Sequence, residues 1–173
     1  MTVMRSAALV ATASLLLATG CGDDSTSGGS AGSAGSAGSG GSSSIDACAI
    51  VTQQDATDLF GETATQGTGQ SGHPASLGEC EWEWENAEAH GHLLQFYVWD
   101  GAQYYTEPPD FQPLAVGEKG YIRVVASSID MGWVQDGKTL GLNYSTFGTS
   151  VTPASTKETE MKALAQKASA GAP

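Results

Sequence analysis

The chain has 173 residues, with 19 acidic side chains against 7 lysines and arginines, and a formal net charge of −12 at pH 7. This charge argues against nucleic acid as a partner, because no basic face is available to meet the phosphates. It argues equally against adhesion of the folded part to an anionic membrane surface.

The first 20 residues have the layout of a secretory signal peptide, so we expect residues 1–20 to be removed. Arg5 supplies the early positive charge, and the apolar run 7–18 is too short to span a bilayer. The sequence LATGC at 17–21 resembles a bacterial lipobox, which predicts lipidation of Cys21. The alternative is an ordinary signal peptide cleaved near by, with Cys21 incidental.

Residues 21–44 are predicted to consist of the lipidated Cys21 followed by a flexible linker. The stretch 25–44 consists of glycine, serine, alanine and threonine, so nothing in it offsets the entropy of ordering. Random-coil scaling gives such a tether a reach of roughly 25 Å. Two or three acyl chains, palmitate among them, would hold Cys21 firmly in a membrane.

The chain has three cysteines, an odd number that needs an explanation in an exported protein. If Cys21 carries lipid, Cys48 and Cys80 remain as a pair. An oxidising compartment then permits a disulfide between them.

The globular part is expected over residues 45–173, which is enough for one compact domain. Asp46 is predicted to cap a short turn through Cys48. Thr52 and Asp55 form a near capping box, and the apolar spacing after them indicates a helix that ends before Gly61. The polar, glycine-rich stretch from 62 to 78 is expected to be a loop.

A strand with one buried and one solvent-exposed side is predicted at 79–85, where apolar and acidic residues alternate strictly in the sequence ECEWEWE. The cysteine and both tryptophans would face the core, and the four glutamates would face solvent. Residues 86–91 connect to a return strand at 93–99, rich in aromatic and branched side chains.

The second half of the domain is predicted to contain three further strands and a helix. Strands are expected at 121–126, 129–135 and 138–147, with Asp136-Gly137 as a two-residue hairpin turn. Gly141 within the last strand indicates a bulge or close packing. A capping box from Ser155 to Glu158 predicts the terminal helix, whose buried face would hold Met161, Leu164, Ala165 and Ala168.

This order of elements predicts an α+β fold. We expect a single domain, an antiparallel sheet with an N-terminal and a C-terminal helix packed on one face. The loop at 100–113 contains three prolines and is expected to run over the surface. Beside it, Trp99, Tyr104, Tyr105 and Phe111 are predicted either to line a pocket or to close a small core under the loop.

A metal site is the main alternative use of polar residues in the sequence. His90 and His92 lie two apart in an extended segment, so both imidazoles would reach one zinc or copper ion together with one or two glutamates. His73 lies in a different loop. The sequence lacks the short motifs of serine hydrolases, zinc proteases and nucleotide-binding enzymes. No catalytic residue and no cofactor are therefore predicted.

Several motifs together resemble a known family. They are DACAIVT at 46–52, Asp55, Gly61, CEW at 80–82, VGEKGY at 116–121, and the terminal helix. The pattern is similar to uncharacterised, lipobox-bearing envelope proteins best populated in actinobacteria, which open Asp-Pro-Cys-x-Leu-Leu-Thr and carry a later Cys-x-Trp. The resemblance implies an exported lipoprotein with Cys48 bonded to Cys80 and an α+β fold, and it implies no activity.

The sequence therefore favours a lipid-anchored cell-envelope protein that acts as a non-enzymatic binding or interaction domain. It would sit on the outer face of the cell membrane, or on the outer membrane if one is present. The alternative is a metal-binding envelope lipoprotein using His90 and His92. A third hypothesis is a hydrolase of envelope polymers.

Overall fold

The computed structural model describes residues 44–68, 72–149 and 151–173. The chain divides into two units, Met1–Gly38 and Ser39–Pro173, and every described residue belongs to the second. The predicted signal peptide, Cys21 and nearly all of the predicted linker lie outside the described residues. Within the described ranges, no helix is long and apolar enough to cross a membrane.

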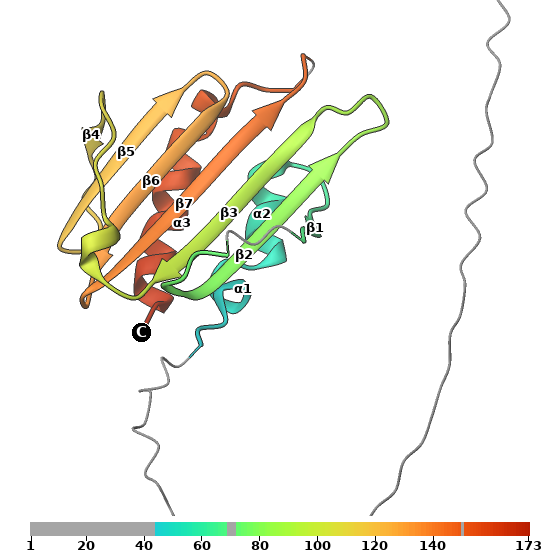
Figure 1. The fold of residues 1–173 in the computed structure, drawn as a ribbon. Coiled ribbons are helices and arrows are strands. Elements are labelled where there is room, and N and C mark those ends of the chain that lie inside the picture. Colours follow the sequence, from blue (N-terminus) through green and yellow to red (C-terminus); the bar gives the residue numbers. More distant parts are fainter. Residues whose placement is uncertain (1–43, 69–71, 150) are drawn as a thin grey trace, which may run out of the picture. The chain divides into compact units, whose positions relative to one another are not determined.

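The fold is built on one sheet of seven antiparallel strands, in the order β1-β2-β3-β7-β6-β5-β4 (Figure 1). The predicted antiparallel α+β class is confirmed. Five long strands form the body of the sheet, and a two-residue strand stands at each edge, which limits pairing with other chains. The strands are β1 (Thr65–Gln66), β2 (Ser76–Glu85), β3 (Gly91–Trp99), β4 (Gln112–Pro113), β5 (Lys119–Val125), β6 (Ser128–Gln135) and β7 (Lys138–Phe147).

The hairpin between β6 and β7 forms at the predicted turn. Asp136 and Gly137 have φ angles of 49° and 72°, the left-handed pair that a two-residue turn of this kind requires. The edge strands β1 and β4 fall in segments predicted as loops. Their side chains are exposed, so no alternation of apolar and polar residues marks them in the sequence.

Two short helices precede the sheet, α1 (Ala47–Ile50) and α2 (Gln53–Phe60). Asp46 caps α1 by accepting from the Ala49 amide, and Thr52 with Asp55 forms the capping box of α2. Gly61, with a φ of 79°, ends α2 in the left-handed conformation that glycine adopts without strain. These predictions are confirmed.

The last helix, α3 (Glu158–Gly171), begins differently from the prediction. Residues Ala154–Lys157 form the 3₁₀ turn η2, and Lys157 precedes α3 without a side-chain cap. The capping box at Ser155 is therefore wrong, because Ser155 already lies inside η2, whose first residue Ala154 is buried in the core. The predicted buried face of α3 is confirmed at all four positions.

The core is one cluster of buried side chains that come from the strands and from the helices. Its largest fully buried side chains include Trp133, Tyr144 and Phe96, and it also takes in Leu59 of α2 and Met161 of α3. We call the side of the sheet that carries these strand residues the core face. The alternate residues of the same strands form the opposite side.

The disulfide between Cys48 and Cys80 joins α1 to β2. The predicted pairing of these two cysteines is confirmed. Beside it, the Trp82 indole donates a hydrogen bond to the Val51 carbonyl oxygen at 2.8 Å. The start of the domain is thus fixed to β2 by a covalent bond and by a buried hydrogen bond.

Candidate functional site

The predicted metal ligands His90 and His92 have different surroundings. His92 is buried on the core face, its Nδ1 lies 2.9 Å from the Tyr144 hydroxyl, and its ring stacks on Phe60 at 5.2 Å between centroids. The His90 ring packs against Gly148, with Nδ1 3.7 Å from a Glu88 oxygen. No group of three histidine, cysteine or acidic side chains suited to a metal gathers among the described residues.

The environment of His92 keeps it neutral. Burial lowers the pKa of the imidazole, the charge of Lys157 lowers it further, and Glu62 opposes the change only in part. A neutral, stacked and hydrogen-bonded imidazole accounts for this residue as a member of the core.

The glutamates of β2 lie on the side away from the core, as the alternation predicts. Two of them interact with β3. Glu79 accepts from the Trp99 indole at 3.4 Å, and Glu81 accepts from the Gln95 amide at 2.6 Å. These carboxylates are part of a side-chain network on the sheet surface.

Two tyrosines and two glycines cross this surface in one row. Tyr97, Gly141, Gly132 and Tyr121 are direct cross-strand partners on β3, β7, β6 and β5. A Cβ atom on Gly141 would lie 2.1 Å from the Tyr97 Cζ, and one on Gly132 would lie 2.6 Å from the Tyr121 Cε1. The tyrosine rings therefore lie directly over the glycines, which leave the space for them.

A pocket of about 200 Å³ opens above this row, and we call it the aromatic pocket. Its floor comes from the sheet, and part of its wall comes from the loop that follows β3 and includes the 3₁₀ turn η1 (Ala102–Tyr104). The lining residues are Tyr97, Trp99, Tyr104, Tyr105, Thr106, Tyr121, Gly132 and Thr139.

One wall of the aromatic pocket is a stack of rings. Trp99 lies between Tyr97, at 4.2 Å between centroids, and His73, at 4.1 Å. Tyr104 meets the His73 ring edge-on at 4.9 Å. Such offset and edge-on contacts add to the stability gained from burial alone, so this wall is formed before any ligand arrives.

The other wall pairs Tyr105 with Tyr121 at 5.8 Å between centroids. The Lys119 ammonium lies 4.6 Å from the centre of the Tyr105 ring, in a cation–π contact. Phe111 packs on Tyr121 without lining the pocket. Thr139 holds the loop in place by donating to the Gly101 carbonyl oxygen at 2.8 Å.

The hydroxyls of Tyr97, Tyr105 and Tyr121 remain protonated at neutral pH. Burial raises the pKa of Tyr97 and Tyr121, and burial with the nearby Glu107 carboxylate raises the pKa of Tyr105 to about 12. Tyr121 donates to Asp130 at 3.2 Å, and Tyr105 donates to Glu107 at 3.0 Å.

The carboxyl group of Asp130 accepts the hydrogen bond from the Tyr121 hydroxyl. Burial raises the pKa of Asp130, and the hydrogen bond from Tyr121, the charge of Arg123 and the amide of Asn143 offset this only in part. The pocket is therefore bordered by a half-buried acid that holds a tyrosine ring in position.

The sequence predicted part of this site. Of the predicted aromatic cluster, Trp99, Tyr104 and Tyr105 line one pocket, and Phe111 supports it from behind. Close packing at Gly141 is confirmed, with Tyr97 as the neighbour. The other members were missed, because only the pairing of β3 with β7 and of β5 with β6 brings them together. A usable signal is the glycine at an alternating position in each of two predicted neighbouring strands.

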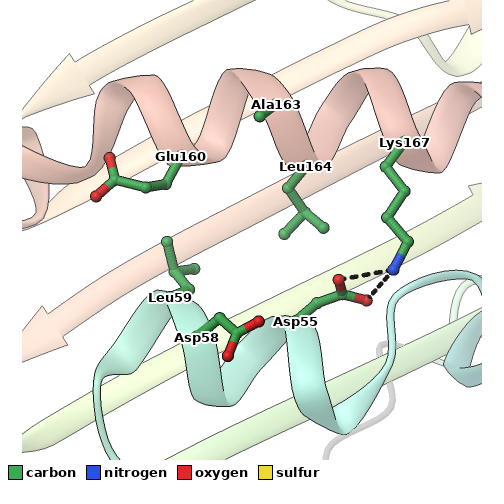
Figure 2. Close-up of a pocket in the computed structure, with 7 residues that line it drawn as sticks. All are labelled: Asp55, Asp58, Leu59, Glu160, Ala163, Leu164 and Lys167. Atoms are coloured by element: carbon green, nitrogen blue, oxygen red, sulfur yellow. Dashed lines mark hydrogen bonds and ion pairs between the residues drawn. The ribbon is translucent and has the colours of Figure 1, made fainter.

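A second hollow lies between α2 and α3 and has a volume of about 290 Å³ (Figure 2). Its lining residues are Asp55, Asp58, Leu59, Glu160, Ala163, Leu164 and Lys167. Lys167 reaches across and bonds both oxygens of Asp55 at 2.6 Å. Although burial alone would raise the pKa of Asp55, the bonds from Lys167 and Thr52 hold it below its usual value. We call this hollow the helix groove.

The remaining charges of the helix groove are bonded locally. Asp58 accepts from Gln54 at 2.7 Å, and Glu160 lies 3.5 Å from Lys157. The apolar floor, formed by Leu59 and Leu164, is almost fully buried. The helix groove thus joins two helices through an ion pair, and it presents less hydrogen-bonding chemistry than the aromatic pocket.

Comparison with family models, with curated proteins and with solved structures finds no match for this chain. The family resemblance seen in the sequence motifs stays an expectation. The aromatic pocket, built from side chains of four strands and one loop, is the candidate functional site on its geometry alone.

Proposed function

We propose that this protein binds a small ligand in the aromatic pocket and does not alter it chemically. The observation that carries the proposal is the row Tyr97–Gly141–Gly132–Tyr121. Glycine inside a strand costs stability, because it brings backbone entropy and no side chain to pack. Two glycines paired across neighbouring strands destabilise the sheet. They also leave the space that the two tyrosine rings occupy on the proposed binding surface.

In this proposal the three helices cover the core face, and the opposite face of the sheet is left for the ligand. Contacts of α1 and α2 with β2, and of α3 with β6, support this arrangement. So does Figure 1, where α2 and α3 lie behind the sheet in the view drawn. A rigid sheet beneath a loop is a good base for such a site, because the scaffold holds the side chains in place.

A binding role fits the chemistry of the pocket better than catalysis does. The hydroxyls of Tyr97, Tyr105 and Tyr121 all have a raised pKa, so they act as neutral donors and acceptors. A tyrosine that served as a base or nucleophile would need its pKa lowered instead. The pocket is also concave, mostly aromatic and supplied with a few placed polar groups, which is typical of small-molecule sites.

The proposal includes the location expected from the sequence. Residues 1–20 would direct export, Cys21 would carry lipid, and residues 21–44 would let the domain at 45–173 move above the membrane. Metabolic labelling with a fatty-acid analogue is expected to mark the wild type and not Cys21→Ser. Equal labelling of the two would remove the lipoprotein part of the proposal and leave the pocket unaffected.

The binding role is tested with protein taken from its own host. Native mass spectrometry of the wild type, purified from membranes, is expected to show a bound small molecule. The double variant Tyr104→Ala/Tyr105→Ala should reduce occupancy about tenfold, since each ring supplies wall area to the ligand. Both positions lie on the surface loop, so the fold should tolerate the change.

Phe147→Ala is the matched control for that experiment. Phe147 is also aromatic and 38% exposed, close to the 36% of Tyr104, but it lies at the end of β7 and does not line the pocket. Occupancy in this variant should equal that of the wild type. Equal occupancy in all three proteins, or a wild type with no bound molecule, would contradict the proposed function.

A further inference from the structure

A second row of side chains runs beside the tyrosine–glycine row, and all of its members are polar. It crosses five strands in direct register, one residue from each. From β2 to β5 the residues are Glu81, Gln95, Asn143, Asp130 and Arg123. We call this set the polar row. It lies two positions along each strand from the row that forms the floor of the aromatic pocket, on the same face.

The polar row and the aromatic pocket are linked into one surface. The Gln95 amide donates to Glu81 at 2.6 Å, and the Tyr121 hydroxyl of the pocket donates to Asp130 at 3.2 Å. None of the five polar residues is buried: Arg123 is exposed, and the other four are partly exposed. A ligand in the pocket can therefore extend onto these side chains without first opening the structure.

The chemistry of the polar row is that of planar groups with paired donors and acceptors. Amides offer both a donor and an acceptor, carboxylates accept at two oxygens, and guanidinium donates in a fixed fork. Neighbouring hydroxyl groups on a ring match such pairs, because each hydroxyl both donates and accepts. The tyrosine rings beside the row suit the apolar C–H face of the same kind of molecule.

We infer that the ligand of this surface is a neutral saccharide, whose ring faces lie on the pocket tyrosines and whose hydroxyl groups bond to the polar row. The inference rests on the proposed binding function of the aromatic pocket. Neighbouring strands lie ~4.8 Å apart, so a row over five strands extends roughly 19 Å. That is several times the width of one sugar ring, and the surface therefore suits a short oligosaccharide.

Charge narrows the choice of ligand further. The chain carries a net charge of −12, and the carboxylates of Glu81, Asp130 and Glu107 outnumber the cations of Arg123 and Lys119 at this surface, so an anionic ligand is disfavoured. An ammonium ligand would need the tyrosine faces, but Lys119 already places its own positive charge over Tyr105. A neutral ligand avoids both conflicts.

The test uses calorimetry on the chain from residue 21 onward, with Cys21→Ser so that no lipid is attached. The probes are neutral oligomers of glucose and of N-acetylglucosamine, one uronic-acid oligomer, and tetramethylammonium. We expect at least one neutral oligomer to bind, and neither charged probe to bind. Asn143→Leu, which removes the central donor and acceptor of the polar row, should weaken that binding about tenfold.

Ser145→Ala is the matched control, because Ser145 lies on the same strand and face as Asn143 but outside the polar row. It should bind the neutral oligomer like the wild type. Circular dichroism of both variants checks that the sheet is intact, and Asn143→Gln, which keeps the amide, should recover part of the affinity. Equal affinity in the wild type and Asn143→Leu would overturn the inference, as would a failure of every neutral oligomer to bind.

The outcomes also separate this inference from the proposed function. Binding of tetramethylammonium or of the uronic-acid oligomer, lost in Tyr104→Ala/Tyr105→Ala, would overturn the inference of a neutral saccharide and leave the pocket as a binding site. If a neutral oligomer binds and that double variant does not weaken it, the pocket is not the site, and both proposals fail.

Discussion

Both faces of the sheet carry aromatic side chains, but these side chains have different roles on the two faces. The core face holds Trp82 and Tyr144, whose polar atoms bond inside the protein, to the Val51 carbonyl and to His92. On the opposite face, the polar atoms of Tyr121 and Tyr105 bond to acids at or near the surface, and Tyr97 lines the aromatic pocket. An aromatic side chain on a strand belongs to the core where other elements cover it, and to the candidate site where they leave it accessible.

Backbone composition marks the same difference. On the core face, neighbouring strands fill the space with large side chains such as Met131 and Leu142. On the opposite face, Gly132 and Gly141 stand side by side and leave the space to rings that come from the outer strands. Packing of this kind forms a concave floor, whereas filled positions would form a convex one.

The strongest test of this difference between the two faces uses two adjacent residues of β3, Phe96 and Tyr97. Phe96 is 1% exposed on the core face, and Phe96→Ala should destabilise the fold by about 3–5 kcal/mol. Tyr97→Ala, on the other face, should cost roughly 1–3 kcal/mol, because its ring is only partly buried, and should abolish ligand binding. Urea unfolding gives both values, and equal losses would mean that the two faces are energetically alike.

The second largest effect concerns the disulfide that joins α1 to the sheet. Cys48→Ser/Cys80→Ser opens a loop with a sequence separation of 32, which the chain-entropy model values at about 3–4 kcal/mol. A domain of this size has a stability of only about 5–15 kcal/mol, so its melting temperature should fall markedly. The fluorescence of the buried Trp82 and Trp133 should report the same transition. Peptide mapping that finds both thiols free in exported wild-type protein would contradict the bond.

A third, smaller effect is the pH dependence of stability that His92, on the core face, is expected to cause. His92 has a lowered pKa in the folded state, so the unfolded chain binds more protons as pH falls below about 6.5. Its contribution to stability is therefore present above that pH and is lost progressively below it, by at most about 1.4 kcal/mol per pH unit.

The variant for this test is His92→Phe/Tyr144→Phe, which removes both hydrogen-bonding partners together and leaves neither unsatisfied. Its stability should vary less with pH between 6.5 and 5 than that of the wild type, as measured by thermal unfolding across that range. Parallel pH profiles would show that His92 does not titrate on unfolding.

The smallest expected effect lies in the helix groove. Lys167→Met removes the ion pair with Asp55, and Lys167 is about half exposed, so the loss should stay below about 1 kcal/mol. Ligand binding in the aromatic pocket should not change. A loss of binding with unchanged stability would place part of the site in the helix groove.

Much of the fold was predictable because its signals are local. The capping pair Thr52 and Asp55, the Asp136-Gly137 turn and the alternation around Trp82 each act within a few residues, and each is confirmed. The error at Ser155 has the opposite cause. Burial of Ala154, a tertiary event, draws the chain into a 3₁₀ turn and moves the helix start to Glu158.

The candidate site was predictable only in part, since its chemistry arises from strand pairing. The spacing of Trp99, Tyr104 and Tyr105 in the sequence indicates a cluster, and the structure places them around one pocket. No spacing links Tyr97 to Tyr121, which approach the same hollow from two sides of a glycine pair. The surroundings of His92 could not be predicted for a related reason: the sequence shows the residue but does not show that its neighbours will be Phe60 and Tyr144.

The bond between Cys48 and Cys80 has a mechanical consequence for a domain held by a tether at its N-terminus. Tension that arrives from the linker enters the fold close to Ile45, whose amide donates to Leu77 on β2. Once the chain is taut at Cys48, the force passes through the disulfide into β2 and bypasses α2 and β1, which lie inside the closed loop. If the proposed membrane anchor is present, a pull transmitted through it would therefore load β2, and it would not unravel α2.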